Sequence, residues 1–534
     1  MKASVNYEPL TPLNFLKRTT FVFPDKPAVV YGNKEFTYRE LSGRVTRLAN
    51  ALKNAGITKG DRVAFLAPNI PPLLEAHYGV PLAGGILVAI NVRLAAKEVE
   101  YILNHSQAKI LVVDKGFAHL IDPIVNNLEC LEKTVLIDDG EQQGQLQGQD
   151  YEDFLAAASD QELPIPVQDE TEPISINYTS GTTGRPKGVM YSHRGTYLNA
   201  LDELLEAGMN SDSKYLWTLP MFHCNGWCFT WAVTAIGGTH VCLRKVDPDL
   251  IYDIIADKQI THLCAAPTVL VSMAAHPKGK ELSLDYTLKV VTAGAPPAPT
   301  VIMNMEQVGA EVIHVYGLTE VYGPHSVCKW QPKWEELENL EKAKIKSRQG
   351  VPFINAGFMR VVDDEMNDIP MDGQTLGEVV MRGNNVMVGY FQQSEDTEQA
   401  FRGGWFHSGD VAVMHPDGYI EIKDRKKDVI ISGGENISTV EVENVIYQHP
   451  EVLECAVVAK PHEKWGEVPK AFVALKETAA CNEEDIINFC KEHIAKYKCP
   501  KEIEFGPLPK TATGKILKYK LREKEWAGKE KRVN

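Results

Sequence analysis

The sequence predicts an α/β fold, with a large N-terminal domain of parallel or mixed sheets flanked by helices and a small C-terminal α+β domain. Apolar runs alternate with helical patterns through most of the chain, and the character of the chain changes sharply at 423–438. The chain has 534 residues. That length exceeds one ordinary core, so about two to four structural units are expected.

The first element that the pattern defines is a helix after Thr37. Thr37 and Glu40 have the spacing of a capping box, and Gly56 is a suitable stop. Between these signals runs an apolar stripe made of Leu41, Val45, Leu48 and Leu52. This spacing predicts an amphipathic helix that turns one face to the core.

Strand-like apolar runs follow at intervals along the chain. They lie at 62–67, 109–114, 239–243, 261–267 and 289–295. Their alternation with helical patterns predicts largely parallel sheets that are covered on both faces. The most apolar long stretch, 73–92, contains Glu75, His77 and Pro81. It therefore predicts a buried helix followed by a strand rather than a membrane span.

Two regions have the composition of connections, and a third begins the small domain. We expect a surface connection at 138–171 and an exposed helix and loop at 334–350. Beyond the charged segment 423–438, a capped helix is expected to begin at Ser438. The elements expected after it are strands at 456–460 and 470–476 and an amphipathic helix over 483–497.

Composition and charge disfavour some classes of function. The hydrophobic content of 44% and the charged content of 24% are those of an ordinary globular protein. A formal net charge of -15 argues against a dedicated nucleic-acid binder, whose phosphate-facing surface is normally basic. The start of the chain lacks the apolar core of a signal peptide, and its last three residues are not a peroxisomal address. We therefore expect a cytoplasmic protein.

The cysteines also indicate a cytoplasmic protein. There are ten, without a CxxC pair, which predicts reduced and mostly buried thiols. Cys224 and Cys228 have the spacing to share a helix face, but no second ligand pair follows at the spacing of a zinc site. The chain contains no HExxH or GxSxG motif, so metalloprotease and serine-hydrolase functions have no support.

The segment YTSGTTGRPKG at 178–188 has the composition of a phosphate-binding loop. Its glycines let backbone N–H groups approach phosphate oxygens, its hydroxyls donate further hydrogen bonds, and Lys187 supplies a positive charge. The alternative is an idle, flexible Gly/Thr turn. Pro186 stands where a Walker A loop has a glycine before the lysine, so the spacing disfavours a P-loop kinase or ATPase.

The chain resembles the acyl-adenylate-forming enzymes, which include acyl-CoA synthetases, aryl-CoA ligases, peptide-synthetase adenylation domains and beetle luciferases. Five signatures stand in the family's order: YTSGTTGRPKG at 178–188, YGLTE at 316–320, HSGD at 407–410, KDRKKDVIISGGENIS at 423–438 and PKTATGKILK at 509–518. The resemblance covers nearly the whole chain. It implies an N-terminal domain at 1–424 with the ATP and acyl sites and a small barrel-like subdomain, a hinge at 425–427 and a mobile C-terminal lid domain at 428–534.

The resemblance also implies an ATP site. The residues that would close on the β- and γ-phosphates are Thr179, Ser180, Gly181, Thr182, Thr183, Gly184 and Lys187. A wall near adenine and the acyl group would be formed by Gly294, Ala295 and Pro296. Tyr316 and Gly317 would lie against adenine, and Asp410, assisted by Arg425, would bind the ribose hydroxyls. Taken alone, Asp410 would be a turn or cap residue.

Two further residues of the nucleotide site are implied at 319 and 320. Thr319 would hydrogen-bond the α-phosphate, and Glu320 would hold Mg²⁺, a hard ion that prefers oxygen ligands. Without the neighbouring motif, Glu320 would be interpreted as a solvated helix start.

Lys515 resembles the family's catalytic lysine, whose ammonium stabilises the charge that shifts as pyrophosphate leaves. Charge alone would favour a solvated surface lysine in this lysine-rich tail. Lys427 occupies the family's hinge position. Rotation there would withdraw Lys515 and bring in the loop of Gly433, Gly434 and Glu435, which would help admit the pantetheine of coenzyme A.

The segment MFHCNGW at 221–227 bears on the acid substrate. The resemblance places His223 at the boundary of the acyl and ATP sites and Trp227, with Gly294, in the acyl pocket. A satisfied core histidine is the alternative for His223. The motif is most similar to a branch that activates short and medium-chain fatty acids, aryl-propenoic acids or 3-methylthiopropionate. A bulky indole favours a short or slender acid, although a hydrophobic pocket separates neighbouring chain lengths weakly.

The predicted function is an ATP- and coenzyme A-dependent carboxylic acid:CoA ligase that forms AMP and pyrophosphate through an acyl-AMP intermediate. The expected acid is short to medium in chain length, such as a fatty acid or 3-methylthiopropionate. Alternatives are an aryl-CoA ligase of the cinnamate or benzoate type and a non-catalytic nucleotide-binding regulator. The expected partners are the acid, ATP, Mg²⁺ and coenzyme A, without nucleic acid or a membrane span. A homodimer is a further expectation, because dimers are common in the family.

Overall fold

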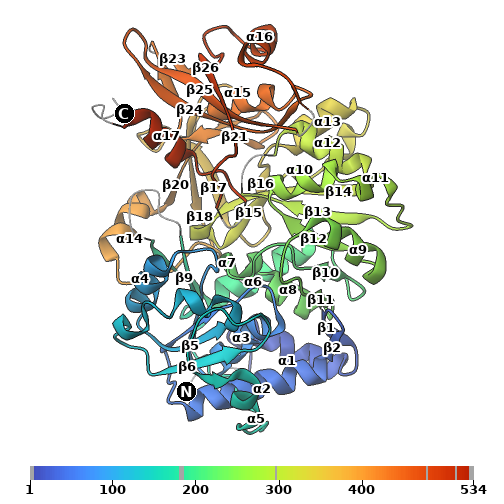
Figure 1. The fold of residues 1–534 in the computed structure, drawn as a ribbon, viewed down its shortest axis with the longest axis vertical. Helices are drawn as coiled ribbons and strands as arrows, with labels where there is room; N and C mark the ends of the chain where they lie inside the picture. The colour runs from blue at the N-terminus through green and yellow to red at the C-terminus, as the bar shows by residue number, and fades with distance from the viewer. Residues whose placement is uncertain are drawn as a thin grey trace.

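A computed structural model describes residues 5–179, 186–294, 297–433, 435–476, 479–511 and 514–527 of the protein. Figure 1 shows two large sheets with their helices in the lower and middle part of the molecule and a smaller sheet at the top. The chain begins at the bottom of this view, and its last helices pack at the top. This arrangement is the mixed α/β fold with a large N-terminal part and a smaller C-terminal part that the sequence predicts.

The first large sheet has eight strands in the order β19-β9-β8-β4-β3-β5-β6-β7. Neighbouring strands from β8 to β7 are parallel, whereas β9 and β19 add antiparallel pairs at the other edge. The bounds are β3 Arg62–Leu66, β4 Ile86–Ala89, β5 Ala108–Asp114, β6 Lys133–Ile137, β7 Gln149–Asp150, β8 Pro173–Tyr178, β9 Gly188–Ser192 and β19 Gly389–Tyr390. The glycine-rich segment therefore joins β8 to β9 at the end of a sheet.

The second large sheet has nine strands in the order β16-β15-β14-β13-β12-β10-β11-β1-β2. Its centre is parallel, and antiparallel pairs stand at both edges. The bounds are β1 Pro27–Tyr31, β2 Lys34–Thr37, β10 Lys214–Leu216, β11 Thr239–Val241, β12 His262–Ala265, β13 Leu288–Thr292, β14 Ala310–Leu318, β15 Gly323–Val327 and β16 Val351–Pro352. The strands predicted in both sheets are confirmed.

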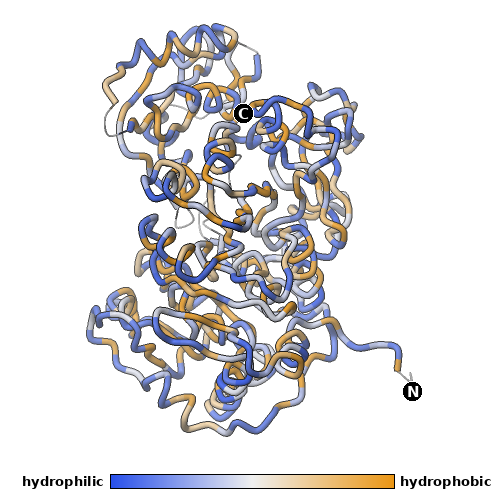
Figure 2. Tube along the Cα trace, turned by 90° about the vertical axis from the view of Figure 1, so that its right-hand side faces the viewer, coloured by the Kyte–Doolittle hydropathy of each residue, from blue (hydrophilic) through white to orange (hydrophobic). Residues whose placement is uncertain are grey.

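Helices cover these sheets, and one buried apolar core includes side chains of both sheets and of the helices between them. The α-helices of this part are α1 Leu13–Val22, α2 Tyr38–Asn54, α3 Pro71–Leu82, α4 Ala96–Ser106, α5 Tyr151–Ala156, α6 His193–Glu206, α7 Cys224–Trp227, α8 Phe229–Ala235, α9 Pro248–Lys258, α10 Pro267–Ala275, α11 Pro277–Glu281, α12 Pro299–Gln307, α13 Asn339–Lys346 and α14 Ser394–Ala400. Figure 2 shows hydrophobic stretches within the layers and hydrophilic stretches along the outside.

Short 3-10 helices complete this part of the chain. They are η1 Lys115–Leu120, η2 Val125–Asn127, η3 Thr319–Val321, η4 Pro332–Trp334 and η5 Arg402–Gly404. In α2 the predicted capping box is present, since the Thr37 side chain accepts from the Glu40 N–H and Glu40 returns a bond to the Thr37 N–H. The predicted stripe of α2 is buried, and α3 followed by β4 confirms the expected buried helix and strand.

A third sheet lies between the large sheets and the C-terminal part (Figure 1). It is antiparallel, in the order β17-β18-β20-β21. Its bounds are β17 Phe358–Val362, β18 Gly377–Arg382, β20 Phe406–Met414 and β21 Ile420–Arg425. The register pairs Asp410 with Arg425 across β20 and β21. Two predicted site residues are therefore cross-strand neighbours.

The C-terminal part has its own sheet and its own apolar core. Its elements are β22 Ile430–Ser432, β23 Glu435–Ile437, α15 Thr439–Ile446, β24 Val452–His462, β25 Gly466–Leu475, α16 Glu483–His493, β26 Glu502–Phe505 and α17 Lys518–Trp526. Ser438 caps α15 by accepting from the Glu441 N–H, as predicted.

Three expectations about local structure need correction. The segment 138–171 is more than a surface connection, because Asp150 caps α5 and the buried side chains of that helix cover the sheet edge. The last helix before β26 ends at His493 rather than at 497. Cys224 and Cys228 do not share the face of a regular helix, since the backbone between them is left-handed.

All ten cysteines are free, and eight of them are buried, as the sequence predicts. The helices among the described residues are too short or too polar to cross a membrane.

A buried ion pair joins α2 to α3. The side chain of Glu75 is 0% exposed, and the Arg44 Nε donates to its Oε1 at 2.6 Å. The Tyr151 hydroxyl donates to the other oxygen at 2.7 Å. These partners satisfy a carboxylate that has no contact with solvent. The ion pair therefore fixes the position of α2 relative to α3.

We expect Arg44→Ala to lower the free energy of unfolding by about 3 to 5 kcal/mol, because it leaves the Glu75 carboxylate buried without its cation. Arg39→Ala on the same helix is the matched control. Its pair with Asp25 is exposed, at 65% and 82%, so the loss should be less than about 1 kcal/mol. Urea unfolding followed by tryptophan fluorescence measures both changes. Equal losses in the two variants would contradict this assignment.

Candidate active site

The base of the glycine-rich loop is closed by two predicted site residues. The Thr179 N–H donates to the Lys187 carbonyl at 3.0 Å, and the Lys187 N–H lies 3.4 Å from the Thr179 hydroxyl. These bonds extend the β8–β9 pairing to the point where the loop leaves the sheet. Ser180, Gly181, Thr182, Thr183 and Gly184 lie outside the described residues.

The Lys187 ammonium has two partners on the segment around α14. Its Nζ is 2.8 Å from Asp396 Oδ1 and 4.7 Å from the centre of the Tyr390 ring. The Tyr390 hydroxyl in turn donates to Glu320 Oε1 at 3.0 Å. Tyr390 thus links the lysine of the loop to the carboxylate predicted to hold a metal.

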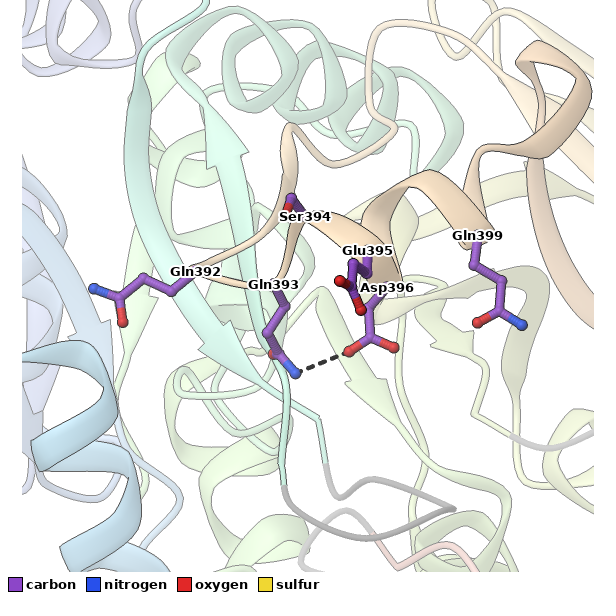
Figure 3. Close-up of a pocket in the computed structure, with 6 residues that line it drawn as sticks. All are labelled: Gln392, Gln393, Ser394, Glu395, Asp396 and Gln399. Carbon is purple, nitrogen blue, oxygen red and sulfur yellow. Dashed lines mark hydrogen bonds between the residues drawn. The ribbon is translucent and has the colours of Figure 1, made fainter.

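A shallow polar hollow of about 450 Å³ lies on the surface beside this network. Figure 3 shows its lining, in which the Gln393 amide donates to the Asp396 carboxylate. The lining residues are Gln392, Gln393, Ser394, Glu395, Asp396 and Gln399. Through Asp396, which pairs with Lys187, this lining contacts the part of the predicted site that the structure describes, so the hollow borders that part of the site.

Asp410 is a buried carboxylate that contacts two other predicted site residues. It is 4% exposed, and the Tyr316 hydroxyl donates to its Oδ2 at 2.7 Å. The Arg425 Nε is 3.2 Å from the other oxygen, Oδ1. Gly317 follows Tyr316 in contact with the backbone of β15, where a Cβ would lie 1.7 Å from the Gly323 carbonyl oxygen. Only glycine fits there.

Lys515 comes to this site from the C-terminal part. It lies at the closing end of a turn, which is held by a bridge between Lys510 and Ile516 and by a bond from the Thr511 N–H to the Lys515 carbonyl at 2.7 Å. Gly514, with φ +84°, lies so close to α10 that a Cβ would lie 2.3 Å from the Thr268 hydroxyl oxygen. The turn therefore docks against the N-terminal part.

The charge of Arg425, followed by burial, lowers the pKa of Lys515 to about 7, although Asp410 opposes the shift. Lys427 and Lys518 add smaller repulsions. The pKa of Lys427, at the predicted hinge, is lowered to about 8 by burial and by the charge of Arg425. Because Arg425, Lys427 and Lys518 lie near Lys515, the charge of this group favours an anionic ligand.

His223 lies on the same side of the site as Lys515. Burial lowers the pKa of His223 to about 4, and the charge of Lys515 adds to this shift. The imidazole is therefore neutral at physiological pH.

A left-handed turn follows His223. Cys224, Asn225, Gly226, Trp227 and Cys228 all have positive φ between 47° and 63°. L-residues avoid this region, and consecutive residues there are rare. The turn buries Trp227 to 4% exposure and brings its ring against Gly323, where a Cβ would lie 2.9 Å from Trp227 Cδ1.

Three of the remaining predicted residues are exposed. Gly294 is exposed, with φ +95°. Gly433 and Glu435 are exposed on the turn between β22 and β23. The Trp465 ring packs on Gly433 and remains 45% exposed. Ala295, Pro296 and Gly434 lie outside the described residues.

Sequence reasoning missed several side chains that the structure brings to the site. They are Tyr191, Asn225, Tyr322, Tyr390 and Asp396. Tyr322 and Asn225 stand within or next to the quoted motifs, so motif proximity could have indicated them. Tyr390 and Asp396 come from a segment without a motif, and only the tertiary fold places them there.

Comparison with known proteins covers nearly the whole chain. The AMP-binding enzyme family matches residues 16–391, and the AMP-binding enzyme C-terminal domain matches residues 441–515. An acetate/butyrate–CoA ligase of Arabidopsis thaliana, named as peroxisomal, is 47% identical over 98% of this chain and 96% of its own. 4-Hydroxybutyrate–CoA ligase 2 of Metallosphaera sedula is 46% identical with the same coverage.

A solved structure is similar over the same length. The crystal structure of an anthranilate CoA ligase in complex with anthranoyl-AMP superposes with a TM-score of 0.87 at 28% identity, covering 98% of this chain and 99% of the other.

Competitive labelling of amines tests the charge state of Lys515. Because Arg425 lowers its pKa to about 7, the amine should become reactive to trace acetic anhydride as the pH rises through about 7. Mass spectrometry of the Lys515 peptide between pH 5 and pH 11, against exposed Lys520 as the reference, measures the profile. In Arg425→Gln the midpoint should move upward. An unchanged midpoint would show that Arg425 does not set the pKa.

Proposed function

The chain belongs to the AMP-binding enzyme family and is an AMP-forming acyl-CoA synthetase that uses ATP and coenzyme A, and we propose that its acid is a short aliphatic carboxylic acid of the acetate-to-butyrate size. The observation that carries the proposal is the buried indole of Trp227. The left-handed turn holds this ring against the Gly323 backbone, so the ring has little freedom to make room for a longer chain. Relatives named for acetate, butyrate and 4-hydroxybutyrate support the same size.

In the first half-reaction a carboxylate oxygen of the acid bonds to the α-phosphorus of ATP, and the bond to the α–β bridging oxygen breaks to release pyrophosphate. Negative charge develops on the pyrophosphate as it leaves. The Lys515 ammonium stabilises this charge more than it stabilises bound ATP. Thr319 donates to the α-phosphate, and the glycine-rich loop with Lys187 holds the β- and γ-phosphates. Neutral His223 bounds the acyl and phosphate regions without adding charge.

Asp410 and Arg425 hold the nucleoside. Two ribose hydroxyls can donate to the Asp410 carboxylate, and one of its oxygens now accepts from Tyr316. The bond from Tyr316 also fixes the ring on which adenine would stack.

Mg²⁺ fits the residues present. Glu320 offers a half-buried carboxylate, of which Oε1 accepts from Tyr390. Within the described residues no group of three or more His, Cys, Asp or Glu could hold a metal by itself. This agrees with Mg²⁺, which usually takes one or two carboxylates together with phosphates and waters. When bound, the ion neutralises phosphate charge.

For the second half-reaction we place the hinge at 425–427, between an N-terminal domain at 1–424 and a lid at 428–534. Rotation at Lys427 withdraws Lys515 and brings Gly433, Gly434 and Glu435 toward the acyl-adenylate. The thiol sulfur of coenzyme A then bonds to the acyl carbon, AMP leaves, and the thiol proton passes to solvent. In the described orientation the α15 N-terminus is tied to the N-terminal side, since the Thr439 N–H donates to Asp424 at 2.7 Å. Rotation must break that bond.

A second candidate is an aryl acid. The similarity to the structure that holds anthranoyl-AMP favours it, because the fold accommodates an aromatic acyl group. 3-Methylthiopropionate is a further slender acid of suitable size.

We propose a cytoplasmic location on the basis of the ten free thiols. The peroxisome is the alternative compartment, because one relative is named as peroxisomal.

Pyrophosphate release with a panel of acids tests the function. We expect ATP-dependent pyrophosphate from straight-chain acids with a maximum between acetate and butyrate, and weaker release from dodecanoate, cinnamate and 3-methylthiopropionate. AMP should accumulate only when coenzyme A is added. Lys515→Ala should lower the rate of adenylation by about a hundredfold to a thousandfold, whereas Lys520→Ala, an exposed lysine on α17, should keep the rate. Release of ADP, or an unaffected Lys515→Ala, would overturn the assignment.

Trp227→Ala tests the proposed size limit. Removing the indole should move the preferred acid toward longer chains, with a gain in kcat/KM of about tenfold for hexanoate relative to acetate, because each added methylene finds apolar space. Trp334→Ala removes a buried indole that packs against Tyr419, away from the left-handed turn 224–228. It should leave the chain-length profile unchanged. A Trp227→Ala profile that matches the wild type would show that another side chain sets the limit.

A further inference from the structure

Two turns meet at one buried phenol: the left-handed turn 224–228, here called the acyl turn, and the turn 319–322, here called the nucleotide turn. Tyr322 is 1% exposed and follows η3 with φ +66°. Its hydroxyl donates to Asn225 Oδ1 at 3.1 Å. Asn225, at φ +49°, stands midway between His223 and Trp227 in the left-handed turn. This hydrogen bond directly joins the two segments that border the acid and the α-phosphate, and the Asn199 amide also bridges them through Cys228 Sγ and the Tyr322 carbonyl.

Tyr322 also fixes the backbone of Thr319. The Tyr322 N–H donates to the Thr319 carbonyl at 3.1 Å, and the Tyr191 hydroxyl donates to the same oxygen at 2.7 Å. The two aromatic rings stack with centres 3.6 Å apart and planes at 14°. A carbonyl held from two sides by stacked residues cannot rotate without losing both bonds.

The Asn225 end of the contact is held through its side-chain oxygen and its backbone carbonyl. The Ser175 hydroxyl donates to the same Asn225 Oδ1 at 2.8 Å, and the Thr230 hydroxyl donates to the Asn225 carbonyl at 3.0 Å. The Thr196 hydroxyl lies 3.1 Å from the Tyr322 oxygen. Because every bond converges on Asn225 or Tyr322, neither turn can shift alone.

Backbone strain is concentrated in these two turns. Nine non-glycine residues of the described chain have positive φ, and five of them are Cys224, Asn225, Trp227, Cys228 and Tyr322. Such conformations persist only where the surroundings over-determine them, and they gather where a site requires a fixed geometry. The bond between Tyr322 and Asn225 links the strained segments side chain to side chain, next to the bridge that Asn199 makes between them.

We infer that Tyr322 and Asn225 are positioning residues for adenylation, an inference that rests on the proposed function. Their contact, here called the Tyr322–Asn225 joint, sets the distance between Trp227, which bounds the acid, and Thr319, which binds the α-phosphate. It thereby aligns the carboxylate oxygen with the α-phosphorus. Neither side chain takes part in the chemistry.

Two substitutions open the joint in different ways. Tyr322→Phe removes the hydroxyl and keeps the stacked ring. Asn225→Gly removes the amide and keeps a left-handed backbone, which glycine adopts without strain. Each should lower kcat for acyl-adenylate formation by about tenfold to a hundredfold, since small misalignments of reacting atoms have effects of that size. The KM for ATP and for the acid should stay within about twofold.

The double variant gives the sharper readout. If both side chains act through one joint, Tyr322→Phe with Asn225→Gly should lose no more activity than the more damaged single variant. Losses that multiply would overturn the inference. Should Asn225→Gly fail to fold, the split between kcat and KM in Tyr322→Phe decides alone.

Tyr38→Phe is the matched control. Tyr38 is 0% exposed, and its hydroxyl donates to the Gly238 carbonyl at 2.6 Å, outside the site. Tyr38→Phe should lose as much thermal stability as Tyr322→Phe and keep the kcat of the wild type. A wild-type kcat in Tyr322→Phe would overturn the joint and leave the proposed function standing. A wild-type chain that forms no acyl-adenylate from any acid would overturn the proposed function itself.

Discussion

The ion pair between Asp410 and Arg425 is the interaction on which the rest of the site depends. It crosses from β20 to β21 at Arg425, the first residue of the proposed hinge, and the Tyr316 hydroxyl donates to the other oxygen of the same carboxylate. One buried carboxylate therefore orders the nucleotide segment and ends the N-terminal part at a fixed place. Arg425 then sets the charge of Lys515, because its guanidinium is the largest cause that lowers the pKa of that ammonium to about 7.

The sequence predicted most of the fold because its local signals agree with the tertiary structure. The capping box at Thr37 and the cap at Ser438 are satisfied by local bonds, and the apolar runs become parallel strands. It also indicated that Asp410 and Arg425 belong to one site, through the order of the motifs. The surface helix α5 was missed because three buried side chains in a polar stretch give too short a pattern to recognise.

The rest of the site could not be predicted because it depends on contacts between distant segments. Asp396 reaches Lys187 only when β19 pairs with β9, and Tyr322 reaches Asn225 only when β15 and the acyl turn are brought together. The spacing of Cys224 and Cys228 is that of one helix face, but spacing alone does not report the sign of φ, and the backbone between them is left-handed. No propensity favours Trp227 at positive φ, so the conformation is imposed by the packing of the surrounding core.

The charge arrangement links the two half-reactions. Arg425, Lys427 and Lys518 all repel Lys515, and only Asp410 attracts it within the same group. The ammonium is stabilised while a triphosphate lies beside it, because the anion outweighs these cations. Once pyrophosphate has gone, most of that negative charge is lost and the repulsion returns. The docked position of Lys515 is then the less favourable one, so in the proposed mechanism the release of pyrophosphate promotes rotation at the proposed hinge, Lys427, and opens the way for the thiol.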